Sequence, residues 1–346
     1  MNRSWNEYEY SKYKLILHPE KTSEFLKILK GEAEYDALFP ISVELHLTNR
    51  CNLICEWCTD RNLHTKVKEM NTETIFRLIS DLTMHGTGIT LEGGGEPTIH
   101  PDFRRIVHFG EDCGAAMGLI TNGTVDISDM VSGFNWIRIS LDASTEDEYI
   151  QEKGVDKFDA VLKNIESISR SRDPAHTQVG VGFVLTKRNH SRLPELLVRL
   201  DKIGVDYIYL RPVEECSVLE PDCEELFLLK KALMSITENL RIKCMMRINE
   251  RMISANAGLP CIAHSLTSII HANGDVIMCE KRRHDIRVFG NLEHQSFEEI
   301  WTSEERRKVS RRVMTASMQE KCSVCRITAY NQLLWELAHV HSSAFI

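Results

Sequence analysis

The sequence predicts an α/β protein in which a partial (β/α)6, TIM-like barrel is followed by a small cysteine-rich α+β domain. From residue 41 onward, short β-rich runs alternate with segments whose apolar residues recur at helical spacing, which is typical of βα units and a parallel sheet. Farther along, between Cys261 and Cys325, cysteines organise the chain. A chain of 346 residues also exceeds the size at which one core usually stops growing, so a second domain is expected.

The barrel is expected from six strands that alternate with helices. The predicted strands are 42–48, 88–92, 116–121, 136–141, 178–185 and 207–212, and the predicted helices are 72–84, 101–112, 157–169 and 193–203. The predicted domains are an N-terminal helical extension (1–39), the barrel (40–215), a helical connector (216–255), the cysteine-rich domain (256–330) and a C-terminal helix or tail (331–346).

The composition argues against several classes of protein. A formal net charge of -8 disfavours broad nucleic-acid binding, which needs a basic surface to displace counterions from phosphate. The N-terminus lacks the apolar run of a signal peptide, and no stretch of about 18 apolar residues suggests a membrane span, so we expect a cytoplasmic protein without a membrane partner. In a reducing compartment, the spacing of eleven cysteines indicates metal binding or catalysis rather than disulfides.

The first cysteine group lies directly after the first predicted strand. Cys51, Cys55 and Cys58 form a C-x3-C-x2-C run. Three thiolates this close in sequence can hold three irons of a [4Fe–4S] cluster and leave the fourth iron open for a ligand. The alternative is zinc, but structural zinc takes four ligands, and the next candidate, His64, does not follow at zinc-finger spacing. The triplet therefore favours an iron–sulfur cluster.

Further polar and glycine-rich segments follow the later strands. In a parallel barrel the loops after the strands gather at one end, where active sites form. The residues concerned are Gly94, Gly95, Glu96 and Pro97 after the second strand, Asn122 after the third, Ser140 and Asp142 at the end of the fourth, and Arg211 and Glu214 at the end of the sixth. Without the cysteines, the glycine segment would pass as an ordinary turn, and Ser140 and Asp142 as a strand-end residue and a helix N-cap.

Together these motifs resemble the radical S-adenosylmethionine (SAM) superfamily, over roughly residues 40 to 215. The family has a C-x3-C-x2-C run with an aromatic residue before the last cysteine, and a GGEP motif, and its fold is the same partial barrel. The matching residues are Cys51, Cys55, Trp57 and Cys58 for the first motif, and Gly94, Gly95, Glu96 and Pro97 for the second.

The resemblance implies a defined set of cofactors and contacts. SAM would chelate the open iron, and the cluster, once reduced by an external donor such as flavodoxin or ferredoxin, would cleave SAM to a 5′-deoxyadenosyl radical. Glycines at 94 and 95 would let backbone carbonyls approach the methionyl ammonium of SAM, with Glu96 as a further acceptor. The other predicted cofactor-binding residues are Trp57, Pro97, Asn122, Ser140 and Asp142, the last two through the ribose or carboxylate of SAM.

A second cysteine group lies near the C-terminus. Its members, Cys261, Cys279, Cys322 and Cys325, suit either tetrahedral zinc or a fully ligated [4Fe–4S] cluster. The pattern, a C-…-G-x4-C followed by C-x2-C, resembles the twitch domain, a shortened SPASM domain that holds one auxiliary cluster. The resemblance implies an auxiliary [4Fe–4S] cluster with four protein ligands, suited to electron transfer rather than to binding substrate.

The predicted reaction depends on how a substrate radical is quenched. An epimerase returns a hydrogen atom from a thiol, and the candidate donor is Cys216, just after the sixth strand, or Cys223 if the loop folds back. A dehydrogenase needs no thiol because the electron leaves through the auxiliary cluster, and Cys216 would then be a bystander. Arg211 and Glu214 are candidate contacts for a polar or cationic substrate, although surface charge explains them equally well.

Three functions are compatible with the sequence. The first is a radical SAM oxidoreductase or epimerase acting on a small-molecule substrate, such as a sugar or aminocyclitol intermediate of natural-product biosynthesis. The second is a maturase that modifies a ribosomally made peptide, although residues 1–39 look short for a separate leader-binding domain. The third is a non-catalytic iron–sulfur or zinc-binding module, for which the GGEP motif has no use.

Overall fold

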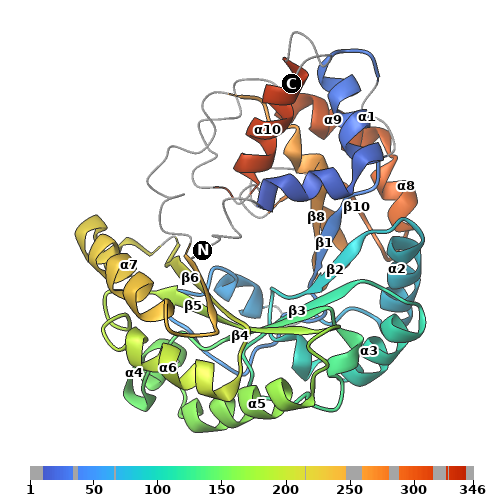
Figure 1. Ribbon diagram of the computed structural model, residues 1–346. Coiled ribbons are helices and arrows are strands. Elements are labelled where there is room, and N and C mark those ends of the chain that lie inside the picture. The colour runs from blue at the N-terminus through green and yellow to red at the C-terminus, as the bar shows by residue number, and fades with distance from the viewer. Residues whose placement is uncertain are drawn as a thin grey trace.

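The computed structural model shows a curved, mostly parallel sheet with helices on its convex side (Figure 1). It describes residues 11–33, 38–65, 68–214, 216–246, 259–279, 288–314, 325 and 327–339. Within these residues the strand order is β10-β9-β8-β1-β2-β3-β4-β5-β6-β7. The predicted α/β class, with a partial barrel, is confirmed.

Seven of the described strands form the parallel wall of the barrel. They are β1 (Ser42–Leu45), β2 (Gly88–Leu91), β3 (Met117–Thr121), β4 (Trp136–Ser140), β5 (Gln178–Leu185), β6 (Tyr207–Pro212) and β7 (Lys243–Met246). Six of them fall in the segments that the sequence predicts as strands. The exception is β7, which pairs with β6 and lies in the connector predicted as helical. Its four residues, KCMM, are too few to show a strand period.

Helices cross the convex face between successive strands. They are α2 (Thr72–Met84), α3 (Phe103–Asp112), α4 (Glu146–Lys153), α5 (Phe158–Ser171), α6 (Leu193–Ile203) and α7 (Cys223–Thr237). Local signals set several of their ends: the Asn71 side chain caps α2, Asp222 forms a capping box at the start of α7, and Gly204 ends α6 in the left-handed conformation. Within the described ranges, no helix is long and apolar enough to cross a membrane.

The two faces of the barrel wall differ in chemistry. Residues such as Ile137 and Ile139 of β4 are fully buried in the main core, against the helices. Because side chains alternate along a strand, Trp136, Arg138 and Ser140 face the barrel interior, where they are only partly buried. The interior of a closed TIM barrel is filled mainly with branched apolar side chains. Polar, partly exposed side chains therefore indicate an interior that admits a ligand.

The C-terminal part of the chain continues the same sheet. Strand β8 (Thr267–Ile270) pairs parallel with β1, and β9 (Asp275–Ile277) and β10 (Gly290–Asn291) follow it antiparallel. The helices at the top of Figure 1 are α1 (Pro19–Leu29), α8 (Phe297–Trp301), α9 (Glu304–Val313) and α10 (Thr328–Ala338). Between α1 and α10 lies a second, smaller core. The N-terminal helix thus packs with the cysteine-rich part.

Candidate active site

The three cysteines of the first motif lie in the loop that leaves β1. Cys51, Cys55 and Cys58 are each partly buried, and the amide of Cys58 donates to the carbonyl of Cys55 at 3.3 Å. Burial raises the pKa of all three thiols, that of Cys58 to about 11, and the charges of neighbouring cysteines add to this effect for Cys51 and Cys58. Thiolates at these positions therefore need a compensating positive group, such as iron.

Two neighbouring segments hold this cysteine loop in place. The amide of Ile54 donates to the carbonyl of Lys153, at the end of α4, at 3.2 Å. A Cβ on Gly154 would lie 2.4 Å from the Ile54 side chain, so α4 needs glycine where it meets the loop. On the other side, Asn122 donates through Nδ2 to Oδ1 of Asn52 at 2.7 Å. Asn122, predicted as a cofactor contact, thus uses its side chain to position the cysteine loop.

The glycine segment after β2 lies against the same loop. Gly93 and Gly94 have left-handed φ values of 66° and 64°, which glycine adopts at little cost. A Cβ on Gly95 would lie 1.9 Å from the carbonyl oxygen of Arg50, the residue before the first cysteine. The carbonyl of Gly94 accepts from Nε2 of His64 at 2.7 Å, so His64 supports this segment. The glycines therefore allow a close approach between the two loops.

Glu96 is buried at the end of this segment and joins β2 to β3. Its Oε1 accepts from Thr98 and from the Thr121 hydroxyl, the latter at 2.6 Å, and its Oε2 accepts from the Asn122 amide at 2.7 Å. Burial raises the pKa of the carboxyl, and these donors oppose the rise. Among the described residues Oε2 has one donor, which leaves a lone pair for a cation. Pro97, also buried, begins the short 3-10 helix that follows.

A buried ion pair beside the cysteine loop was not predicted from the sequence. Asp142 has a left-handed φ of 57°, and its carboxylate pairs with the ammonium of Lys153. Burial by itself lowers the pKa of Lys153, but the charges of Asp142 and Cys55 raise it above its usual value. The N-cap of α4 is Thr145, not Asp142. The Asp142 carboxylate positions Lys153, which differs from the predicted direct contact with SAM, whereas Ser140 faces the open interior.

A polar network connects the cysteine loop to the end of β5. Nε1 of Trp57 donates to Oε2 of Glu152 at 2.7 Å, and the Lys153 ammonium lies 5.1 Å from the centre of the Trp57 ring. Arg188 donates from Nε to Oε1 of Glu152 at 3.2 Å and from both terminal nitrogens to Glu56. The indole of Trp57, predicted as a cofactor contact, is therefore oriented by α4.

The residues predicted as substrate contacts lie at the end of β6. Nη1 of Arg211 lies 3.6 Å from Oε1 of Glu214, so the two side chains pair with each other. Cys216 is partly buried in a small apolar cluster that Trp57 also contacts. The cluster consists of Val184, Val213 and Leu219. Cys216 and the cysteine loop thus lie at the same end of the barrel, whereas Cys223 is exposed at the start of α7.

Two of the predicted auxiliary cysteines flank the β8–β9 hairpin. Cys261 precedes β8 and Cys279 follows β9, and both pack partly buried against the main core. Cys325 comes shortly before α10, while Cys322 lies outside the described residues. The structure therefore shows three of the four predicted ligands.

Helix α10 fixes the segment that carries Cys261. The side-chain oxygen of Asn331 accepts from the amides of Ile262 and Ala263 at 2.7 and 3.0 Å, and its nitrogen donates to the carbonyl of Pro260 at 3.0 Å. One side chain thus satisfies three backbone groups next to a predicted ligand.

The two donor sets fit iron–sulfur clusters. Thiols are the ligands that such clusters take. Near the Cys55 thiol lies the phenol of Tyr149, whose oxygen is buried without a partner among the described residues. Within the described ranges, no three ligating side chains converge closely enough to hold a single metal ion. Three thiolates on three different irons need no such convergence.

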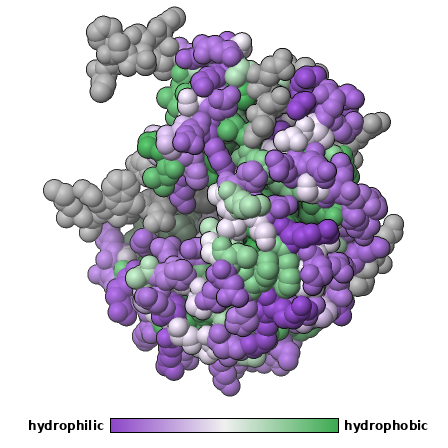
Figure 2. Space-filling view, turned by 90° about the vertical axis from the view of Figure 1, so that its right-hand side faces the viewer, coloured by the Kyte–Doolittle hydropathy of each residue, from purple (hydrophilic) through white to green (hydrophobic). Residues whose placement is uncertain are grey.

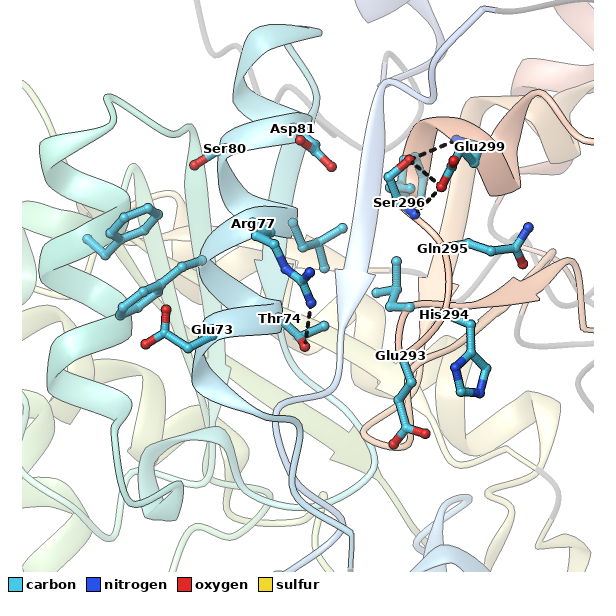
Figure 3. A pocket seen from close by; sticks show the side chains of 15 residues that line it. Glu73, Thr74, Arg77, Ser80, Asp81, Glu293, His294, Gln295, Ser296 and Glu299 are labelled. Atoms are coloured by element: carbon cyan, nitrogen blue, oxygen red, sulfur yellow. Dashed lines mark hydrogen bonds between the residues drawn. The ribbon is translucent and has the colours of Figure 1, made fainter.

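A groove on the outside of the barrel lies apart from this site. It has a volume of about 640 Å³ and lies between α2 and the loop from β10 to α8 (Figure 3). Glu73, Arg77 and Asp81 line it from α2, and the segment 292–297 lines the other side. Figure 2 shows this side of the molecule, which is mostly hydrophilic with a band of hydrophobic residues near the middle. No predicted site residue lines the groove, and we assign it no function.

Comparison with known proteins identifies both parts of the chain. The model of the radical SAM superfamily matches residues 45–197, and the SPASM model, an iron–sulfur cluster-binding domain, matches residues 261–326. The chain belongs to the radical SAM superfamily. It is therefore an enzyme, and the non-catalytic alternative is excluded. Its cofactors are SAM, the [4Fe–4S] cluster that binds SAM, and an auxiliary iron–sulfur cluster.

Several relatives of this radical SAM protein match about three quarters of the chain or more. The tungsten-containing aldehyde ferredoxin oxidoreductase cofactor-modifying protein of Pyrococcus furiosus is 25% identical, over 75% of this chain and 80% of the relative. The mycofactocin maturase MftC of Mycobacterium tuberculosis is 25% identical, over 76% of this chain and 70% of the relative. The structure of Streptococcus suis SuiB bound to the precursor peptide SuiA has a TM-score of 0.65 at 14% identity and covers 93% of this chain and 78% of SuiB, which shows a shared fold.

Proposed function

We propose that this radical SAM enzyme is a maturase that oxidises a ribosomally made peptide. The observation that carries the proposal is the kind of relative that matches about three quarters of the chain: a maturase and a cofactor-modifying protein. The shared fold with SuiB, a structure that contains a precursor peptide, adds support. These similarities favour the peptide alternative over the sugar or aminocyclitol substrate predicted first from the sequence.

In this proposal the loops after β1 and β2 hold the cofactors. When bound, the reduced cluster and SAM supply a radical that abstracts a hydrogen atom from the substrate. Cys51, Cys55 and Cys58 hold that cluster. The carbonyls of the glycine segment and Oε2 of Glu96 would accept from the methionyl ammonium, while Lys153, enclosed and paired with Asp142, would act on this site only through its charge. Ser140, which faces the interior, is available to the ribose.

In this proposal the predicted auxiliary ligands hold the auxiliary cluster. They are Cys261, Cys279, Cys322 and Cys325. Strand β8, which lies between two of them in sequence, pairs with β1, so the auxiliary site is attached to the same sheet as the SAM site. An external one-electron donor such as flavodoxin or ferredoxin supplies the reducing equivalent.

Net oxidation is favoured over epimerisation. The apolar cluster around Cys216, shared with Trp57, accounts for the position of this thiol without a role as hydrogen donor. Because Arg211 and Glu214 pair with each other, they shape the rim rather than await a charged substrate.

The test is anaerobic turnover with a candidate precursor. The reconstituted enzyme is incubated with SAM, a reductant and a short peptide encoded beside its gene. We expect 5′-deoxyadenosine to form and the peptide to lose the mass of two hydrogen atoms. An unmodified peptide, together with consumption of a sugar-type metabolite in the same assay, would contradict the proposal.

A further inference from the structure

Arg138 is a cation of the barrel interior that has aromatic neighbours but no anion. It lies in the middle of β4 and faces the interior, opposite to the buried Ile137 and Ile139. Its guanidinium carbon lies 4.7 Å from the centre of the Tyr209 ring and 5.7 Å from that of Trp136. Among the described residues it forms no hydrogen bond and no ion pair, and its nitrogens are not sealed from solvent.

Two glycines on β5 make the room for this arrangement. The Arg138 side chain crosses Gly182, and its Cγ and Cδ lie 3.5 Å from the position of a Cβ there. A Cβ on Gly180 would lie 2.1 Å from the ring of Tyr207. Side chains from β4 and β6 therefore meet over β5, and the guanidinium is directed toward β6 rather than out of the barrel.

The chemistry of this side chain selects its ligand. A guanidinium over an aromatic face keeps its in-plane N–H groups free for a planar anion, and a carboxylate accepts two of them in parallel. Two other cations of the site are already paired, Arg211 with Glu214 and Lys153 with Asp142. Arg138 is the one of these three that has no carboxylate among the described residues.

Arg138 lies deeper in the barrel than the loops that hold the cofactors, so it is placed for the substrate rather than for SAM. It precedes Ser140, at the end of β4, by two residues, or about 7 Å along the strand. The cysteine loop and the glycine segment lie at the strand ends. We infer that Arg138 binds a carboxylate of the substrate that reaches into the barrel. Given the proposed function, on which this identity rests, that group is an acidic side chain or the C-terminal carboxylate of the peptide.

The test compares Arg138→Met with a matched control. The control is Arg199→Met, which makes the same change on helix α6, outside the barrel. The guanidinium of Arg199 also lies over an aromatic ring, 5.8 Å from the centre of Phe158. Methionine keeps an apolar stem over Gly182, and no polar partner loses a bond, so Arg138→Met is expected to fold. Each acidic side chain of the peptide is replaced by its amide in turn, and the C-terminus is amidated in a further version.

We expect one of these amides to raise the KM of the wild-type enzyme by about 10- to 100-fold, the effect of losing a charge-assisted pair. Arg138→Met should show that increase with the unchanged peptide and no further increase with the amide, whereas Arg199→Met should behave as wild type. Equal KM values for the acid and all amides would overturn the inference. Loss of peptide-independent 5′-deoxyadenosine formation in Arg138→Met would also overturn it, by assigning the residue to SAM.

Failure of the proposed function is distinguishable from failure of this inference. If the wild-type enzyme modifies no peptide, binding of N-acetylglutamate and N-acetylglutamine to the SAM-loaded holoenzyme is measured by calorimetry. If the acid binds more tightly than the amide, and this difference disappears in Arg138→Met, the result supports a carboxylate site for another substrate. Equal binding of acid and amide overturns it.

Discussion

At the scale of single residues, buried charge surrounds the cysteine loop. The side chains of Asp142 and Lys153 are almost fully enclosed, at 1% and 2% exposure, where either charge alone would be strongly unfavourable. The backbone of Asp142 is held by Asn189, whose Nδ2 donates to the Asp142 carbonyl at 2.8 Å. The pair therefore keeps the Lys153 ammonium beside Cys55, where its charge lowers the pKa of that thiol and favours the thiolate.

Removing one member of this pair should destabilise the protein. Lys153→Met leaves the Asp142 carboxylate buried without a cation, and we expect the free energy of unfolding to fall by about 3–5 kcal/mol. The double variant Asp142→Asn/Lys153→Met should regain much of the loss, because asparagine carries no charge and tolerates a left-handed φ. Urea unfolding before cluster reconstitution gives the values. Lys163→Met, on the exposed side of α5, is the control, and an equal loss there would refute the expectation.

The role of Cys216 has a separate test. If the product is oxidised rather than epimerised, Cys216→Ala should still form it, and turnover in heavy water should place no deuterium at the reacting carbon. Cys223→Ala, in which an exposed thiol is removed, serves as the comparison. Mass spectrometry of the product decides. Continued 5′-deoxyadenosine formation with loss of product in Cys216→Ala alone would mean that the thiol is a hydrogen donor.

At the scale of elements, the loops after β1 and β2 form one unit. The amide of Gly95 donates to the carbonyl of Thr48 at 2.8 Å, and the amide of Glu96 donates to that of Arg50 at 2.7 Å. These bonds join the cysteine motif to the GGEP motif through their backbones. The geometry of either loop therefore depends on the other.

A single methyl group should disturb this unit. In Gly95→Ala the new Cβ would lie 1.9 Å from the Arg50 carbonyl oxygen, and backbone atoms cannot swing aside as a flexible side chain can. We expect a loss of about 1–3 kcal/mol in stability, as for other overpacked sites, together with fewer irons bound per chain. In Gly88→Ala the nearest atoms lie 3.7 Å away or farther, so both quantities should stay near wild type. Thermal unfolding and iron analysis test this; identical results for the two variants would contradict it.

The sequence predicts the elements that have a local pattern and misses the contacts between residues far apart in the chain. Helices α2 and α6 have the bounds expected from their apolar periodicity, and the cysteine and glycine motifs lie where short-range spacing places them. The supporting network joins residues far apart, such as Trp57 and Glu152, and it leaves no local pattern. The short, highly charged α4, which carries Glu152 and Lys153, likewise has little periodicity.

At the scale of the whole molecule, the barrel and the auxiliary part share one sheet. The register pairs Ser42 with Thr267 and Leu45 with Ile270, across more than half of the chain. Such a pairing cannot be deduced from local sequence, which predicts the two parts as successive domains. The boundaries proposed for them remain predictions. Their shared sheet indicates that they fold together.

This coupling leads to a prediction for a truncated chain. Removal of residues 259–346 uncovers the edge of β1 and part of the smaller core, which includes Phe25 of α1. An uncovered parallel edge presents unpaired backbone groups and promotes aggregation. We expect the fragment to aggregate or to unfold without cooperativity, as measured by size-exclusion chromatography and thermal unfolding.

A full-length variant separates the effect of the strand from that of the cluster. Cys279→Ser removes a predicted auxiliary ligand but keeps β8 on β1, so it should elute like the wild type and unfold cooperatively while binding about four irons rather than about eight. If the strand pairing matters less than the metal, Cys279→Ser should instead fail in the same way as the truncated chain. A fragment that stays free of aggregates and unfolds cooperatively would show that the barrel does not need β8 at its edge, and the shared sheet would then be a consequence of folding rather than a condition for it.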